Sequence, residues 1–372
     1  MVDYNDLGVK KIINAAGTYT KFSGSLMSHE VLKAMEIASH NFVDIDELLQ
    51  KTGEYIAKSI NAEAALITAG AAAGLTLSAA ACMAGSKPEC IKALPNTEGM
   101  KNEIIIMRCH RNPYDNAMIV AGAKFIEIGN AIETYSWEFK DAIGEKTAAV
   151  AFFVQSEMLE ASLSLTKIIE IAHAKNIPVI VDAAAELPPI ENLNKFTKMG
   201  ADIVLFSGGK DFRGPQSSGL ILGKRDIVNI CRIHGYPHHA IGRPMKLDKE
   251  TIMGFVRAFE LYLKEDHQKR IERWEKQVQR IFKGLSSIPH IQVLQGYPTQ
   301  PLTQPATIPR IYVKFDEEGL GLTKEDIARE LYEGDPRIAA VVEKNYLTFN
   351  PHMLAEGEED LIIERMKEII KK

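Results

Sequence analysis

Lys210 follows a run of apolar residues, directly after a hydroxyl and two glycines. Residues 201–206 have the length and composition of a buried strand, and Ser207-Gly208-Gly209 connects that strand to the lysine. In α/β proteins ligands bind at the carboxyl ends of such strands, where glycines let a bare backbone approach them. A lysine there can form a Schiff base with a carbonyl cofactor if its surroundings lower its pKa. A solvated lysine after an ordinary Gly-Gly turn explains this stretch alone equally well.

Other strand ends offer the remaining groups that a pyridoxal phosphate site needs. Asp182 follows a short apolar strand and suits the ring nitrogen, while Gly70-Ala71-Ala72 and Ser207 suit the phosphate. His110 follows another strand and could lie over the ring. Each residue alone has an ordinary structural explanation, as a turn, cap or hydrogen-bonding residue. Their common placement at strand ends favours a cofactor site that uses Lys210 as the amine.

The segments that would position these residues alternate between strands and helices. We expect strands at 64–68, 103–107, 124–128, 148–154, 178–181, 203–206 and 218–222, and helices at 28–38, 45–60, 70–84, 116–121, 135–143, 165–175 and 192–199. The strands are almost wholly apolar, which predicts a mostly parallel sheet covered on both faces. Ser28 and Ser164 are placed to cap the helices that they precede.

A long amphipathic helix at 249–285 is expected to lead into a small α+β unit. That unit has expected strands at 310–315, 338–342 and 346–349 and expected helices at 323–332 and 356–370. We therefore predict three parts: an N-terminal segment, 1–48, that packs with the small domain; a large cofactor-binding domain, 49–246; and the linking helix with the small domain, 247–372.

Composition excludes several classes of function. The 372-residue chain has a net charge of −5, which disfavours a nucleic-acid partner. Its four cysteines lack metal-ligand spacing and are expected to be reduced thiols. The first residues lack the features of a secretion signal, and no apolar run is long enough to span a membrane. We expect a cytoplasmic protein with no membrane partner.

Several motifs resemble the pyridoxal-phosphate enzymes related to selenocysteine synthase, and most closely their D-glucosaminate-6-phosphate ammonia-lyase-like group. The matching stretches cover nearly the whole chain, and the lysine motif is the most specific of them. They are Ile13-Asn14-Ala15-Ala16-Gly17-Thr18, Thr68-Ala69-Gly70-Ala71-Ala72-Ala73-Gly74, Val181-Asp182-Ala183-Ala184-Ala185-Glu186, Phe206-Ser207-Gly208-Gly209-Lys210, Arg213-Gly214-Pro215-Gln216 and Gly242-Arg243-Pro244-Met245-Lys246.

The resemblance implies fold type I, the aspartate aminotransferase architecture, with active sites shared across a homodimer. By motif match Lys210 forms the Schiff base and Asp182 faces the ring nitrogen. Ser207 and the Gly70 turn bind phosphate, His110 stacks on the ring, and Gln155 contacts the ring hydroxyl. The phosphate turn lacks the hydroxyl that is common in relatives, so its phosphate would depend more on backbone N–H groups. Selenocysteine synthase activity itself is disfavoured, since this chain is acidic and too short for the family's tRNA-contacting region.

The expected reaction is elimination of a β-hydroxyl from a polar 2-amino acid, with or without a phosphate, such as an amino-sugar acid. Lys210 would remove the Cα proton, and the products would be a 2-oxo acid and ammonia. Racemisation, transamination and β-replacement start with the same proton removal and stay open. A catalytically idle relative of the fold is a further alternative, against which Asp182 and Lys210 argue.

Substrate contacts are expected from cationic and polar residues in the matching motifs. A guanidinium fork suits carboxylate and phosphate, which points to Arg213 and Arg243, with Lys246 as a further cation. Thr18 and Gln216 are further candidates, whereas Arg111 is at least as well explained by surface ion pairing. A cluster of histidines, His234, His238 and His239, could suggest a metal, but we predict none.

Overall fold

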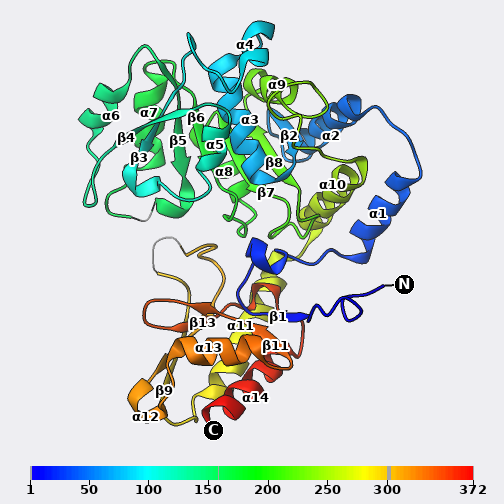
Figure 1. Ribbon diagram of the computed structural model, residues 1–372, viewed down its shortest axis with the longest axis vertical. Coiled ribbons are helices and arrows are strands. Elements are labelled where there is room, and N and C mark those ends of the chain that lie inside the picture. The colour runs from blue at the N-terminus through cyan, green and yellow to red at the C-terminus, as the bar shows by residue number, and fades with distance from the viewer. Residues whose placement is uncertain (1, 158, 300–302, 372) are drawn as a thin grey trace. The chain divides into compact units, whose positions relative to one another are not determined.

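The structure is a computed structural model that describes residues 2–157, 159–299 and 303–371. It divides into two compact units (Figure 1). The larger contains Met27–Lys264 and a short loop piece at Gln304, and the smaller contains the chain up to Leu26 and most of the chain from Glu265. The domain limits predicted at residues 48 and 246 differ from this division, because helices α1 (His29–Ser39) and α10 (Lys249–Lys264) pack on each other within the larger unit.

Within the described residues, the larger unit forms a seven-stranded sheet in the order β2-β8-β7-β6-β5-β3-β4. The strands are β2 (Ala64–Thr68), β3 (Glu103–Met107), β4 (Lys124–Ile128), β5 (Thr147–Phe153), β6 (Val179–Asp182), β7 (Ile203–Ser207) and β8 (Gly219–Gly223). Only β8 of these runs antiparallel to its neighbours, β2 and β7. The predicted α/β architecture with a mostly parallel sheet is confirmed.

Helices flank this sheet (Figure 1). They are α1, α2 (Ile45–Ser59), α3 (Gly70–Ala84), α4 (Pro88–Ala93), α5 (Asn116–Val120), α6 (Ser136–Ala142), α7 (Leu165–His173), α8 (Asn192–Met199), α9 (Arg225–His234) and α10. Every residue of β5 is buried, which requires cover on both faces. Ser28 and Ser164 accept hydrogen bonds from the first turns of α1 and α7, as predicted. The sequence did not predict α4 and α9, and α9 packs its apolar side against β2 and β8.

The single helix predicted at 249–285 is wrong. The chain forms α10 and a second helix, α11 (His267–Leu285), with a break at Glu265 and Asp266. The Asp266 carboxylate accepts a hydrogen bond from the Lys269 N–H at 3.1 Å. An aspartate that caps a new helix in this way competes with the backbone hydrogen bonds of a continuous helix. The helix therefore ends here, although the amphipathic pattern of the sequence continues.

The smaller unit has a separate hydrophobic core. Its strands are β1 (Ile12–Asn14), β9 (Ile291–Gly296), β10 (Arg310–Phe315), β11 (Arg337–Ala339), β12 (Val341–Val342) and β13 (Leu347–Phe349), and its helices are α11, α12 (Glu317–Leu320), α13 (Lys324–Glu333) and α14 (Glu358–Ile370). The N-terminal β1 pairs in parallel with β11, so this unit combines the two ends of the chain. None of the helices described in either unit is long and apolar enough to span a membrane.

Candidate active site

The carboxyl ends of the parallel strands bring the predicted cofactor residues to one edge of the larger sheet. Gly219 of β8 pairs with both Thr68, at the end of β2, and Ser207, at the end of β7. Asp182 ends β6 opposite Phe153, the last residue of β5. The Gly70 turn, Asp182, Ser207 and the residues that follow β3 and β5 therefore meet where open α/β sheets bind ligands.

The loop after β7 holds Lys210 through backbone and aromatic contacts. The Gly208 N–H donates to the Ser218 carbonyl at 2.9 Å, and the Arg213 N–H donates to the Lys210 carbonyl at 3.0 Å. Phe212 is buried against α10, with its ring centroid 5.4 Å from that of Phe255. Packing of this residue two positions after the lysine anchors the loop to a rigid helix.

Gly208 and Gly209 allow close packing within this loop. The sequence predicted instead that they let the backbone approach a ligand. A Cβ on Gly208 would lie 2.1 Å from the Ser218 hydroxyl oxygen, and one on Gly209 would lie 2.7 Å from the Cα of Gln216. Larger residues at either position would displace the turn that holds Lys210. Gly70 instead faces open space, since a Cβ there would meet nothing within 4 Å.

The turn at Gly70 has the features of an anion-binding turn. Gly70 has a φ of +87° and begins α3, and no side chain that the structure describes caps this helix. The Thr68 hydroxyl donates to the Gly70 carbonyl at 2.9 Å, which holds the turn. The first N–H groups of a helix have no intrahelical acceptor, and the helix dipole adds positive potential. The N–H groups of Ala71 and Ala72 are thus suited to a phosphate.

Asp182 and Lys210 influence each other across the site. The Ala184 N–H donates to Asp182 Oδ1 at 2.8 Å and orients the carboxyl. Burial raises the pKa of Asp182, and the nearby Lys210 charge opposes this shift. Burial lowers the pKa of Lys210, while Asp182 and Glu186 oppose that change. A buried lysine with a lowered pKa is the form that suits a nucleophile and a proton acceptor.

Glu186 is a third ionisable group here, for which the sequence predicted no role. It is only 7% exposed. Burial, reinforced by the charge of Asp182, raises the pKa of Glu186 to about 8, so the carboxyl holds its proton at neutral pH. The available signal was a glutamate four residues after Asp182, in a turn that is otherwise made of alanines.

The raised pKa of Glu186 predicts a pH-dependent stability. The unfolded chain releases this proton near the ordinary pKa of 4.5 and the folded chain near 8. Between these values the folded state binds more protons, so the contribution of Glu186 to stability falls as pH rises, by up to about 1.4 kcal/mol per pH unit. We expect the free energy of unfolding of wild type minus that of Glu186→Gln to fall between pH 5 and 8 in urea titrations. If this difference in the free energy of unfolding does not change with pH, Glu186 does not hold a proton with a raised pKa.

His110 is buried and makes two hydrogen bonds within the chain. The Phe153 N–H donates to Nδ1 at 3.0 Å, so Nε2 carries the proton and donates to the Ser162 hydroxyl at 2.8 Å. Burial lowers the pKa of His110 to about 3, which keeps the imidazole neutral. The ring also contacts the edge of Phe152, with centroids 4.6 Å apart. These contacts join the ends of β3 and β5, and the stacking role of His110 stays a prediction.

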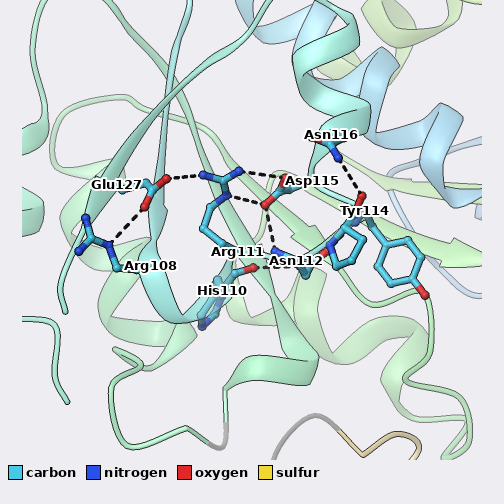
Figure 2. Close-up of polar contacts among 9 residues, drawn as sticks. Arg108, His110, Arg111, Asn112, Tyr114, Asp115, Asn116 and Glu127 are labelled. Carbon is cyan, nitrogen blue, oxygen red and sulfur yellow. Dashed lines mark hydrogen bonds and ion pairs between the residues drawn. The ribbon is translucent and has the colours of Figure 1, made fainter. Parts of the chain in front are cut away.

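Arg111 is held by ion pairs next to His110 (Figure 2). Its guanidinium pairs with the buried Asp115, with Nε 2.6 Å from Oδ2, and also with Glu127. The Asp115 carboxylate in turn accepts a hydrogen bond from the Asn112 N–H at 3.0 Å. The alternative of ion pairing therefore accounts for Arg111, and these contacts hold the loop after β3.

The predicted substrate-binding residues occupy different places. Arg213 and Gln216 lie in the loop after Lys210, and Gln155 follows β5 in a short 3-10 helix. Arg243 and Lys246 lie in the loop after α9, where the Arg243 guanidinium carbon is 5.2 Å from the Tyr236 ring centroid. Thr18 belongs to the smaller unit. The substrate roles of Thr18, Arg213, Gln216, Arg243 and Lys246 stay predictions, as does the cofactor contact of Gln155.

The histidines after α9 have other partners. His234 is buried and shares a hydrogen bond with the Gly85 carbonyl at 2.8 Å, and His238 lies 3.1 Å from Asp46. In residues 2–157, 159–299 and 303–371 we find no group of three or more side chains able to hold a metal ion.

The site fits pyridoxal phosphate by the chemistry of its groups. An amine with a lowered pKa, a carboxylate and the open N-terminus of α3 lie at one sheet edge. These are the groups that an aldehyde, a pyridine nitrogen and a phosphate require. Lys210, Asp182 and the Gly70 turn would hold the cofactor, with Ser207 next to them.

Comparisons with known proteins identify the family and the fold of this chain. Residues 12–275 match the family described as L-seryl-tRNA selenium transferase, SelA. The chain is 32% identical to a D-glucosaminate-6-phosphate ammonia lyase of Salmonella typhimurium, over 98% of this chain and 97% of that one. It is 28% identical to a 5'-C-glycyluridine monooxygenase-decarboxylase of a Streptomyces species, over 99% and 92%. A solved D-glucosaminate-6-phosphate ammonia-lyase has a TM-score of 0.86 at 31% identity, covering 100% of this chain and 99% of that chain. These likenesses confirm the fold type I architecture.

Proposed function

This chain belongs to the L-seryl-tRNA selenium transferase (SelA) family of pyridoxal-phosphate-dependent enzymes, and from that premise we propose that it is an ammonia-lyase for a polar 2-amino acid. The observation that carries the proposal is the similarity to an ammonia lyase over nearly the full length of both chains. The cluster of Lys210, Asp182 and Glu186 at the sheet edge supports it. The substrate that we propose first is an amino-sugar acid, and D-glucosaminate 6-phosphate is its best candidate.

Each residue of the site has a defined task in this reaction. When bound, pyridoxal phosphate supplies an aldehyde that joins to amines and a ring that accepts the electron pair released at Cα. The Lys210 amine removes the Cα proton, and the Asp182 carboxylate holds a proton on the ring nitrogen. The N–H groups of the Gly70 turn and the Ser207 hydroxyl bind the phosphate. Loss of a β-hydroxyl and hydrolysis then yield a 2-oxo acid and ammonia.

The reaction is tested with a panel of amino acids assayed for three products. The purified chain, loaded with pyridoxal phosphate, is incubated with D-glucosaminate 6-phosphate, D-glucosaminate, and both enantiomers of serine. Released ammonia, 2-oxo acid and inverted stereoisomer are measured together. Equal amounts of ammonia and 2-oxo acid support the lyase. Inversion without ammonia would indicate a racemase instead, and amino-group transfer without ammonia would indicate an aminotransferase.

We also propose that the active sites are shared between two copies of the chain.

Arg243 is proposed to bind an anionic group of the substrate. Among the residues that the structure describes, its guanidinium has no carboxylate partner and lies over Tyr236. An arginine without an acidic partner is free to pair with a carboxylate or phosphate. We expect Arg243→Ala to raise KM for D-glucosaminate 6-phosphate by about 10-fold or more, with a smaller change in kcat. The control is Arg108→Ala, because that arginine is exposed and paired with Glu127. An unchanged KM would exclude the role.

A further inference from the structure

We propose that Glu186 is the general acid of this elimination and donates its proton to the departing β-hydroxyl of the substrate. Lys210 then restores that proton. The inference rests on the lyase function proposed above and adds a residue to the same site. It assigns a task to a buried acidic side chain that cofactor binding does not require.

The backbone holds Glu186 beside Asp182. The two residues are separated by three alanines, and the Glu186 N–H donates to the Ala183 carbonyl at 3.1 Å, which closes a turn. Asn192, the first residue of α8, donates its side-chain N–H to the Glu186 carbonyl at 2.6 Å. The turn is therefore fixed on both sides of the side chain, and a glutamate so held needs little reorganisation to act in a reaction.

The carboxyl of Glu186 is largely withdrawn from bulk water, and among the described residues it has no ion pair. In the described part of the chain, its oxygens accept no hydrogen bond from another residue, and they are not among the fully enclosed polar atoms. They therefore keep a small solvent-accessible surface, although the side chain as a whole is only 7% exposed. A buried carboxyl without a partner costs free energy, and such strain gathers at functional sites.

Burial is the main reason that Glu186 keeps its proton, and the charges around it act in both directions. Asp182 and Glu157, which follows β5, disfavour a second negative charge, whereas Lys210 and Lys195 on α8 favour one. Burial outweighs the two lysines, and the pKa of about 8 lies close to neutral pH. A general acid works best when its pKa is near the working pH.

The proton transfers balance over one cycle. The neutral Lys210 amine first takes the Cα proton, and in a second step the electron pair left at Cα forms the Cα=Cβ double bond. The Cβ–O bond breaks, and its electron pair stays on the oxygen, which receives the Glu186 proton and leaves as water. The Glu186 carboxylate then accepts a proton from the Lys210 ammonium. Both groups return to their starting states without an added acid or base.

The decisive variant is Glu186→Gln, which keeps the size of the side chain but has no acidic proton. With D-glucosaminate 6-phosphate in D₂O, wild type should exchange the Cα proton and release ammonia. In Glu186→Gln we expect exchange within about threefold of wild type and ammonia release reduced by about 10²-fold to 10⁴-fold. Glu186→Asp should recover part of the lost rate. The matched control is Glu191→Gln, an exposed glutamate five residues later, which should behave as wild type.

A measurement on the cofactor-free protein tests the proton itself. Infrared difference spectra should show a protonated carboxyl that titrates near pH 8 in wild type and in Glu191→Gln, and that is absent in Glu186→Gln. Ammonia release by Glu186→Gln at the wild-type rate, loss of exchange together with release, or an unchanged infrared band would each overturn the assignment. Wild type that releases no ammonia from any member of the panel would overturn the lyase proposal, and this role with it.

Discussion

Replacing Lys210 by alanine should abolish ammonia release, with a loss of more than about 10⁴-fold. The variant lacks both the amine that would hold the cofactor and the group that removes the Cα proton. Wild type loaded with pyridoxal phosphate should have a visible absorption band that borohydride reduction bleaches, and the variant should lack it. The absorption band reports cofactor attachment and ammonia release reports the reaction. The two can be separated because only ammonia release requires a substrate.

The fold should survive this substitution, since Lys210 contributes little to the core. The loop is held by the backbone bonds of Gly208 and Arg213 and by the buried ring of Phe212. Circular dichroism and the unfolding midpoint should therefore match wild type. Lys175→Ala removes an exposed lysine and is the control. Retention of both the band and ammonia release in Lys210→Ala would show that another amine serves the site.

Replacing Asp182 by asparagine is expected to reduce kcat by about 10²-fold to 10⁴-fold. The amide oxygen can still accept the hydrogen bond of the Ala184 N–H, which measures 2.8 Å in the native site. The amide carries no charge, so it cannot hold a proton on the ring nitrogen. Because Asp182 raises the pKa of Lys210, the variant should also lower that pKa further. The pH profile of reductive methylation of Lys210, read by mass spectrometry of the cofactor-free protein, measures this shift.

Asp182→Glu provides the matching control. It restores the negative charge on a longer side chain, so the Lys210 pKa should return towards the wild-type value. Its kcat should lie between those of wild type and Asp182→Asn, since the carboxylate would be misplaced. Activity of Asp182→Asn within about threefold of wild type would show that the charge of this residue is not needed.

Much of the larger unit was predictable from local patterns. Apolar runs of strand length, alternating with helical periodicity, determine a mostly parallel sheet, and parallel strands place their carboxyl ends at one edge. Asp182 and Lys210 each follow such a run, so their order along the chain was enough to bring them to that edge. Caps such as Ser28 were equally clear, because a cap depends on residues within one turn of the helix.

These sequence patterns could not predict contacts between segments that are distant in the chain. The break between α10 and α11 interrupts a continuous amphipathic pattern, and α9 owes its place to packing on β2 and β8. The glycines before Lys210 are required by Ser218 and Gln216, which approach them only when the loop closes. From the sequence alone, Arg111 could have contacted a ligand, but in the structure it pairs with Asp115 and Glu127.

The sequence by itself determined the sheet, the lysine and aspartate at its edge and, through its motifs, the family of the protein. Only the tertiary structure decided the charge states of these groups. Burial sets the pKa values of Lys210 and Glu186, and burial depends on every segment that covers the site. In the sequence, nothing distinguishes Glu186 from the other glutamates as a group with a raised pKa. It becomes a proton-holding group only where the fold withdraws it from water and sets it beside Asp182.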